Sequence, residues 1–204
     1  MTPKNQIRRE PTNLRVLLAH SDEETIKVLK TALTDLGNEI VAVCKTGAGI
    51  VAKVTELRPD LVVTGVDMPD FDGVTALVET SRSVAIPSIV VTPKRSLEIV
   101  ERALLDHVMA YIVEPVDLEE IKPTIYLVLR RFEQFEELQD EVASLKETLE
   151  QRKVIERAKG VLMRRSNVTE EEAFAKLRRM ATDQRIKLVE AAKQVLAVDT
   201  AIEE

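Results

Sequence analysis

The stretch that decides the fold of the first half of the chain is DLVVTGVDMPDFDG, residues 60–73. It opens with a short apolar run, Asp60–Gly65, whose β-branched residues are typical of a buried parallel strand. A polar loop, Met68–Gly73, follows, and the pattern of Val74–Ser81 then predicts a helix. A buried strand, a loop and a helix in this order indicate one unit of an α/β sheet.

The same unit recurs on both sides of this stretch. Further strands are predicted at Arg15–Ala19, Glu39–Val43, Ser88–Thr92 and Ala110–Val113. Helices are predicted at Glu23–Leu36, Gly47–Leu57, Leu97–Leu105 and from Leu118 onward. This alternation predicts an α/β domain with a doubly wound five-stranded parallel sheet over residues 13–131. Residues 1–12 are polar, and we expect them to form a disordered leader.

The helix that begins near Leu118 is predicted to continue to about Arg165, beyond the sheet domain. Apolar residues recur in it at alternating spacings of three and four, which is a heptad pattern. Phe135, Val142 and Leu149 occupy a positions, and Leu138 and Leu145 occupy d positions. We therefore expect a coiled coil over residues 132–151 that joins two copies of the chain. The alternative is one long amphipathic helix that packs on its own domain.

Beyond Gln151 the local charge changes sign. Residues 152–187 carry eleven Lys and Arg against five Asp and Glu. Thr169 and Glu172 form a predicted capping box that opens a helix from Glu170 to about Ala181. The expected core face of this helix is Ala173, Phe174, Leu177 and Met180. A last helix is predicted from about Gln184 to Leu196, so residues 152–198 should form a small all-α module of three helices.

The composition excludes several classes of protein. The net charge is −6, so a basic nucleic-acid-binding surface has to be local. Aromatic residues make up 3% and Trp is absent, which disfavours a platform of stacked aromatic rings. One cysteine and two histidines leave little for a disulfide or a metal site. We expect no cofactor, no metal, no catalytic activity and no membrane segment, and a cytoplasmic location.

The first domain resembles the receiver domain of two-component response regulators. The resemblance covers residues 13–131 and rests on the loop Met68–Gly73, on Thr92 and on Tyr111 with Pro115. It implies a phosphorylation pocket whose slots fall on His20, Ser21, Gly65, Thr92 and Glu114. A receiver needs an acceptor Asp where Gly65 stands, an acidic pair for Mg²⁺ at His20 and Ser21, and a Lys at Glu114.

The acceptor, the acidic pair and the Lys are therefore all replaced, and only Thr92 keeps the expected residue, so we expect no aspartyl phosphorylation. Asp67 and Asp22 lie near the lost acids, but both should point elsewhere. Ser21 with Glu24 fits a capping box for the first helix, with Asp22 in its first turn.

The last module contains four sequence blocks in order: Ile155–Met163, Thr169–Phe174, Leu177–Ala181 and Lys187–Ala191. In these blocks it resembles the ANTAR domain, with Thr182 as a departure. The resemblance implies binding to hairpins in leader transcripts and antitermination of transcription. The candidate RNA-binding residues are Lys159, Arg164, Arg165, Arg178, Arg179, Arg185 and Lys187. Gly160 either opens the helix surface to RNA or permits close helix packing.

The sequence therefore predicts an RNA-binding antitermination regulator with a pseudoreceiver domain. Its expected partners are leader RNA, a second copy of itself and a regulatory protein. Two alternatives stay open at this point: a DNA-binding response regulator of the helix-turn-helix type, and an adaptor that binds only proteins.

Overall fold

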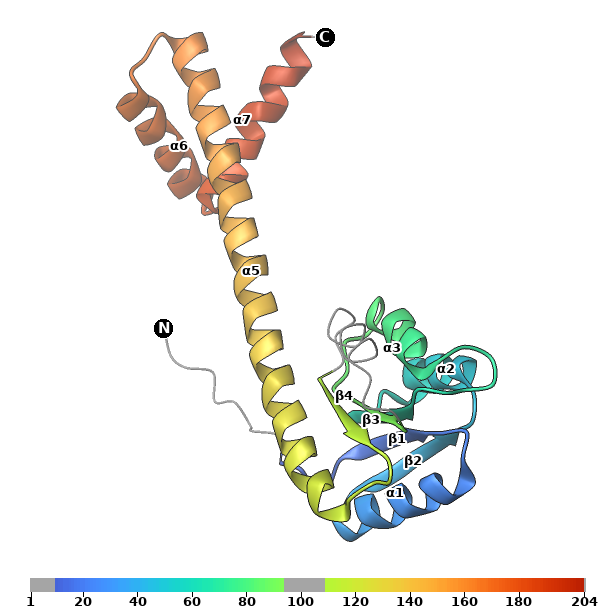
Figure 1. The fold of residues 1–204 in the computed structure, drawn as a ribbon. Coiled ribbons are helices and arrows are strands. Elements are labelled where there is room, and N and C mark those ends of the chain that lie inside the picture. The colour runs from blue at the N-terminus through green and yellow to red at the C-terminus, as the bar shows by residue number, and fades with distance from the viewer. Residues whose placement is uncertain (1–9, 94–108, 204) are drawn as a thin grey trace. The chain divides into compact units, whose positions relative to one another are not determined.

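The structure is a computed structural model, and it describes residues 10–93 and 109–203 (Figure 1). The expected helix Leu97–Leu105 and most of the expected leader lie outside these residues. The chain divides into two compact units, Met1–Glu136 and Glu137–Glu204. Within the described residues, no helix combines the length and the apolar character needed to cross a membrane.

The first unit is built on a five-stranded parallel sheet in the order β2-β1-β3-β4-β5. The strands are β1 Arg15–Ala19, β2 Glu39–Cys44, β3 Leu61–Gly65, β4 Ser88–Thr92 and β5 Ala110–Val113. All five lie where the sequence predicted them, to within one residue at each end. The fold class is confirmed.

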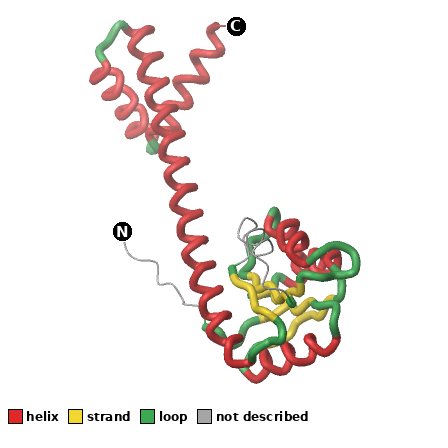
Figure 2. Tube along the Cα trace, in the orientation of Figure 1, coloured by secondary structure: helices red, strands yellow, loops and turns green. Residues whose placement is uncertain are grey.

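Helices cover both faces of this sheet, as Figure 2 shows for the first unit. They are α1 Glu23–Asp35, α2 Gly47–Leu57, α3 Gly73–Ser81 and the first part of α5, Leu118–Ser166. Helices α1 and α5 pack on one face, where Leu29 and Ile125 meet Val63. Helices α2 and α3 pack on the other, where Ile50 and Leu77 meet Val62. The sheet is therefore doubly wound, because helices cover both of its faces. Strands buried on both faces are nearly continuous apolar runs, which explains the sequences of β3 and β4.

Helix α1 begins at Glu23 as predicted, but the predicted cap residue is wrong by one position. Asp22 is the N-cap, and its carboxylate accepts a hydrogen bond from the Thr25 backbone N–H at 2.7 Å. Ser21 lies before the cap and is exposed, so the expected capping box of Ser21 with Glu24 does not form. A carboxylate at the cap also interacts favourably with the positive end of the helix dipole.

The loop after β3 is tied to the start of α2. The two carboxylate oxygens of Asp70 accept hydrogen bonds from the backbone N–H groups of Gly47, at 2.7 Å, and Ala48, at 2.9 Å. Hydrogen bonds from Ala48, Gly47 and the loop backbone lower the pKa of Asp70 to about 2. This loop is therefore held in place by the unpaired N–H groups of a neighbouring helix.

The second unit consists of the end of α5, α6 Glu170–Gln184 and α7 Leu188–Glu203. Ala158, Leu177 and Ala192, one from each helix, form its centre. The capping box of Thr169 and Glu172 is confirmed, with both reciprocal hydrogen bonds present.

The expected start of the last helix at Gln184 is wrong. Helix α6 continues to Gln184 and ends at Arg185, whose φ of 54° places it in the left-handed region. That conformation stops an α-helix, so α7 begins only at Leu188.

Candidate nucleic-acid interface and the altered receiver pocket

The structure brings together four of the five residues expected at the receiver pocket. Gly65 and Thr92 end the strands β3 and β4. His20 directly follows β1, and Glu114 directly follows β5, where its backbone N–H donates to the Thr92 carbonyl at 2.9 Å. The carboxyl ends of parallel strands share one edge of the sheet, which is why these residues meet. Ser21 is exposed.

The side chain of His20 fills the acceptor position. It is buried, and a β-carbon placed on Gly65 would overlap its ring, lying 2.8 Å from Nε2. A real β-carbon does not approach another heavy atom so closely. The imidazole of His20 therefore occupies the space in which a receiver holds its acceptor side chain, and only a glycine fits at position 65.

The imidazole is oriented by its neighbours. Nδ1 accepts a hydrogen bond from the Asp22 backbone N–H at 3.0 Å, so the ring proton lies on Nε2. Nε2 faces Glu114 Oε1 at 3.7 Å, and Thr25 Oγ1 donates to the same oxygen at 2.8 Å. His20, Thr25 and Glu114 thus form a small polar network where a receiver holds its phosphoryl group.

This network does not fit Mg²⁺. Mg²⁺ needs several oxygen ligands in octahedral geometry, and His20 supplies a nitrogen that is already hydrogen-bonded. The Asp22 carboxylate is engaged at the cap of α1. Within residues 10–93 and 109–203, no group of three His, Cys, Asp or Glu side chains is placed to hold a metal ion. Asp67, the other nearby acid, is exposed.

In the second unit, Lys159 differs from the other predicted RNA-binding residues. It is only 8% exposed, and its ammonium group lies 2.9 Å from Glu156 and 2.6 Å from Glu170. The hydrogen bonds to Glu170 and Glu156 raise the pKa of Lys159. The ammonium also lies 6.0 Å from the centre of the Phe174 ring, within cation–π range. Lys159 therefore joins α5 to α6, and its charge is already balanced.

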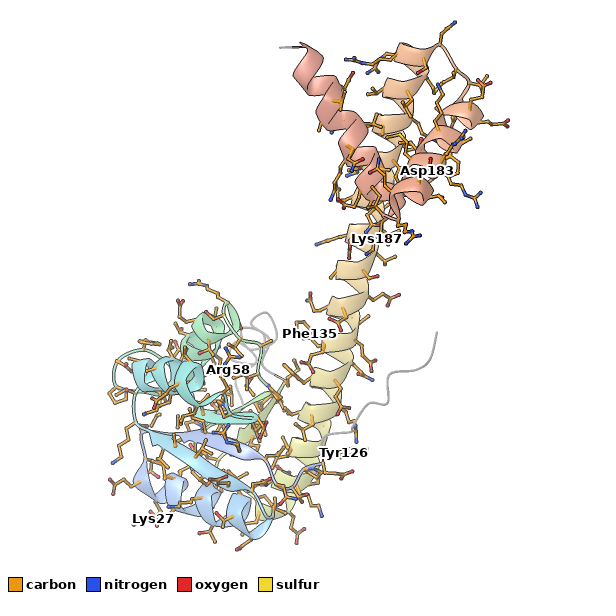
Figure 3. All side chains as sticks on the ribbon, turned by 180° about the vertical axis from the view of Figure 1, so that it is seen from behind. Lys27, Arg58, Tyr126, Phe135, Asp183 and Lys187 are labelled. Carbon is orange, nitrogen blue, oxygen red and sulfur yellow. The ribbon has the colours of Figure 1, made fainter. Side chains whose placement is uncertain are left out.

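The remaining six candidates are accessible to a ligand. They are Arg164, Arg165, Arg178, Arg179, Arg185 and Lys187. Arg164 and Arg165 lie close to Asp199 of α7, at 3.9 and 2.5 Å. Arg179 lies 3.9 Å from Asp183, and both side chains are largely exposed. Lys187 precedes α7 and, with Asp183, is labelled in Figure 3.

Sequence reasoning misplaced Phe174. It was expected on the core face of α6, but its ring is 41% exposed, while Ala173, Leu177 and Ala181 are buried. The ring lines an open hollow together with Arg178, Ala181, Thr182, Arg185, Ile186 and Leu188. Phe174 directly follows Ala173, and adjacent residues of a helix point about 100° apart. The sequence pattern of α6 therefore did not show which of the two is buried.

Gly160 borders open space. A β-carbon there would meet only the tip of Arg164, at 3.9 Å. Close helix packing therefore does not require a glycine at this position, and of the two explanations the accessible helix surface fits the structure.

The residues of the predicted coiled coil fall into two groups. Leu138, Val142, Leu145 and Leu149 are exposed in the single chain, with Val142 at 44% and the others higher. Phe135, labelled in Figure 3, is half-buried in the first unit, where its ring centre lies 6.4 Å from that of Phe132. The apolar stripe available to a second helix therefore begins at Leu138.

Comparisons with known proteins agree with this division of the chain. Residues 16–126 match the family described as the response regulator receiver domain, and residues 143–196 match the ANTAR domain. The transcriptional regulatory protein PdtaR of Mycobacterium tuberculosis is 38% identical over 183 residues, which covers 89% of both chains. The nitrate regulatory protein of Klebsiella oxytoca is 42% identical over 77 residues, or 38% of this chain and 19% of that protein.

Solved structures support the fold of the first unit. The signal receiver domain of a modulated diguanylate cyclase from Desulfovibrio desulfuricans has a TM-score of 0.55 at 21% identity and covers 59% of this chain and 97% of its own. That identity shows the fold alone. The family rests on the two domain matches and on the full-length relative: this chain belongs to the response regulators that join a receiver domain to an ANTAR domain, which are RNA-binding regulators of antitermination.

Proposed function

We propose that this chain binds hairpins in leader RNA as a dimer, through exposed cations of residues 152–198, without aspartyl phosphorylation of its receiver unit. The observation that carries the proposal is a contrast among the basic residues. Lys159 is buried and paired, whereas Arg178, Arg185 and Lys187 are exposed and form no ion pair within the described residues. Cations that stabilise a fold are paired in it, whereas cations that bind phosphate have to face solvent.

The charge distribution supports RNA as the ligand. The chain as a whole carries −6, yet residues 152–187 carry an excess of basic residues. Such a local basic surface attracts a phosphate backbone, while the acidic remainder disfavours indiscriminate binding. Arg178 and Lys187 form no ion pair within the described residues, so binding phosphate costs them no existing partner.

The exposed stripe of α5 supports dimerisation. Leu138, Val142, Leu145 and Leu149 repeat every three or four residues on a helix that is otherwise charged. A second copy of the same helix would bury these side chains, with a and d residues interlocking between the two helices. The stripe is short, so dimerisation should respond strongly to single substitutions.

The altered receiver pocket supports control by a partner. With Gly65 in the acceptor slot and Glu114 in the place of the cation, the unit lacks its own chemical switch. We propose that a regulatory protein, or assembly driven by RNA, takes over this role. Because leader transcripts are made in the cytoplasm, we also propose that the protein acts there. We further propose that it acts by binding and has no catalytic activity.

The test starts with crosslinking and sequencing of RNA bound to the full-length protein in cells. A hairpin recovered in this way is compared in filter binding with duplex DNA of the same sequence, over a series of salt concentrations. Preference for the hairpin, with affinity falling as salt rises, is the expected result. Preference for the duplex DNA would favour the helix-turn-helix alternative, and absence of binding to both would favour a protein-binding adaptor.

A further inference from the structure

The exposed ring of Phe174 lies outside the apolar cluster at the centre of the second unit. The core contacts of α6 come from Ala173, Leu177 and Ala181, which are buried. Aromatic residues make up only 3% of the chain, and the residues around this exposed ring indicate what it can bind.

These surroundings form a hollow of ≈ 460 Å³ along α6 and the turn before α7. The Phe174 ring lines it together with apolar side chains of Ala181, Ile186 and Leu188. Arg178 and Arg185 line it as well, and both are exposed. The hollow therefore combines an aromatic ring, an apolar floor and two cations.

The ring is held in position from the side of α5. Lys159 lies 6.0 Å from the ring centre, and Glu156 and Glu170 fix its ammonium group. A ring fixed in this way loses little conformational freedom when a flat ligand stacks on it. The two arginines differ from Lys159, since neither forms an ion pair within the described part of the chain.

We propose that this hollow binds one unpaired nucleotide of RNA. Its base stacks on Phe174, while Arg178 and Arg185 contact the phosphates on either side of it. The inference rests on the proposed function and names the part of the RNA that this site binds. A base inside a duplex is stacked on both sides and its ring faces are closed, so only a base in a loop or bulge can enter. The flanking cations then act on the backbone on either side of it.

The experiment uses the full-length protein with two fluorescent RNA probes that share one stem. The first probe is a pool of hairpins with a randomised loop, and the second is the same stem as a blunt duplex. Phe174→Leu removes the aromatic ring but keeps an apolar side chain of similar size, and Phe174→Tyr keeps the ring. Circular dichroism and thermal unfolding establish that both variants fold.

We expect Phe174→Leu to bind the hairpin pool about tenfold more weakly, which is the effect of losing one stacked base. Its affinity for the blunt duplex should not change, and neither should the dependence of hairpin binding on salt, because no phosphate contact is lost. Phe174→Tyr should bind both probes like the unchanged protein. A 2-aminopurine placed in the loop should be quenched by the unchanged protein and by Phe174→Tyr, but not by Phe174→Leu.

Two results would overturn the inference and leave the proposed function intact. One is equal binding of the hairpin pool by Phe174→Leu and the unchanged protein. The other is an equal loss on hairpin and duplex, which would indicate a change in the fold or the charge of the surface. If the unchanged protein binds neither probe, RNA binding itself fails and the stacking site fails with it.

Discussion

The ammonium group of Lys159 lies 2.6 Å from the carboxylate of Glu170, which links the last part of α5 to the first turn of α6. The same ammonium lies 2.9 Å from Glu156, one turn earlier on its own helix. The sequence places this lysine in the block Ile155–Met163, in the middle of the basic module. In the structure, its ion pairs with Glu156 and Glu170 hold α5 and α6 together.

Lys159→Ala is therefore expected to lower the thermal stability of the second unit without changing the salt dependence of RNA binding. The substitution leaves Glu156 and Glu170 without their cation and removes a buried stem. Thermal unfolding followed by circular dichroism measures the first effect, and filter binding at several salt concentrations measures the second. Lys176→Ala, an exposed lysine of α6, is the matched control and should leave the unfolding temperature unchanged. A stable Lys159→Ala protein with a reduced salt slope would place Lys159 among the RNA contacts instead.

Arg178→Ala and Lys187→Ala are expected to show the opposite pattern. Each should leave the unfolding temperature unchanged, because neither side chain forms an ion pair within the described residues. Each should reduce the slope of log affinity against log salt by about one, the value for one lost phosphate contact. Lys30→Ala, an exposed change of the same charge on α1, is the control. Unchanged slopes for both variants would mean that this surface is merely solvated.

Val142→Glu or Leu145→Glu should abolish dimerisation. Each removes an apolar side chain from the exposed stripe of α5 and places a charge opposite its symmetry mate. The loss is ~1.5–3 kcal/mol per chain, plus the cost of desolvating the charge. Sedimentation velocity measures the mass. Ser144→Glu adds the same charge to the same helix away from the stripe, and it should leave the dimer intact. A stripe variant that keeps the mass of the unchanged protein would show that the dimer, if it forms, uses another surface.

Asp70→Asn should lower the free energy of unfolding of the first unit at neutral pH. It should also make that free energy depend less on pH in the acidic range. The pKa of Asp70 is lowered from 3.8 to about 2 by backbone hydrogen bonds, first that of Ala48. A carboxylate with a depressed pKa stabilises the folded state above its ordinary value, and this contribution is lost as the pH falls from about 4 towards 2. Urea unfolding across this range measures the difference. Asp67→Asn, in the same loop but exposed, serves as the control and should unfold like the unchanged protein.

Gly65→Ala should destabilise the first unit by ~1–3 kcal/mol, the usual cost of overpacking. The added methyl group would overlap the ring of His20. His20→Ala in the same protein should remove most of this penalty, so the two substitutions should be coupled by about 0.5–3 kcal/mol in urea unfolding.

The same geometry predicts that acetyl phosphate with Mg²⁺ labels neither the unchanged protein nor Gly65→Asp. The second variant supplies an acceptor, yet Glu114 and His20 still occupy the positions of the cation and the metal ligands. A base-labile phosphate on either protein would contradict this reading of the pocket.

Local patterns were enough to predict the sheet. β1, β4 and β5 begin and end where the sequence placed them, because each is a short β-branched run between clear breaks. The capping box at Thr169 was equally readable, since its two partners are three residues apart. At α1 the sequence predicted Ser21 as the cap, whereas the structure has Asp22 there, and the Asp22 backbone N–H donates to Nδ1 of the buried His20.

The features that could not be predicted involve residues far apart in the chain. Which flank of α6 is buried depends on where α5 and α7 pack, so the exposure of Phe174 was not visible in the pattern of α6 alone. The pairing of Lys159 with Glu170 spans a loop, and the overlap of His20 with position 65 joins the ends of two strands. Composition gave the charge of the module, but it did not distinguish paired cations from exposed ones.

The close approach of the His20 ring to Gly65, at the end of β3, also limits which substitutions the pocket tolerates. Recovering a phosphorylatable receiver would require an acid at position 65, but that step alone crowds the imidazole of His20 and lowers stability. Vacating position 20 first would leave a void beside Glu114, again at a loss. Each of the two single substitutions therefore lowers stability, so an acid at position 65 requires a compensating change at position 20.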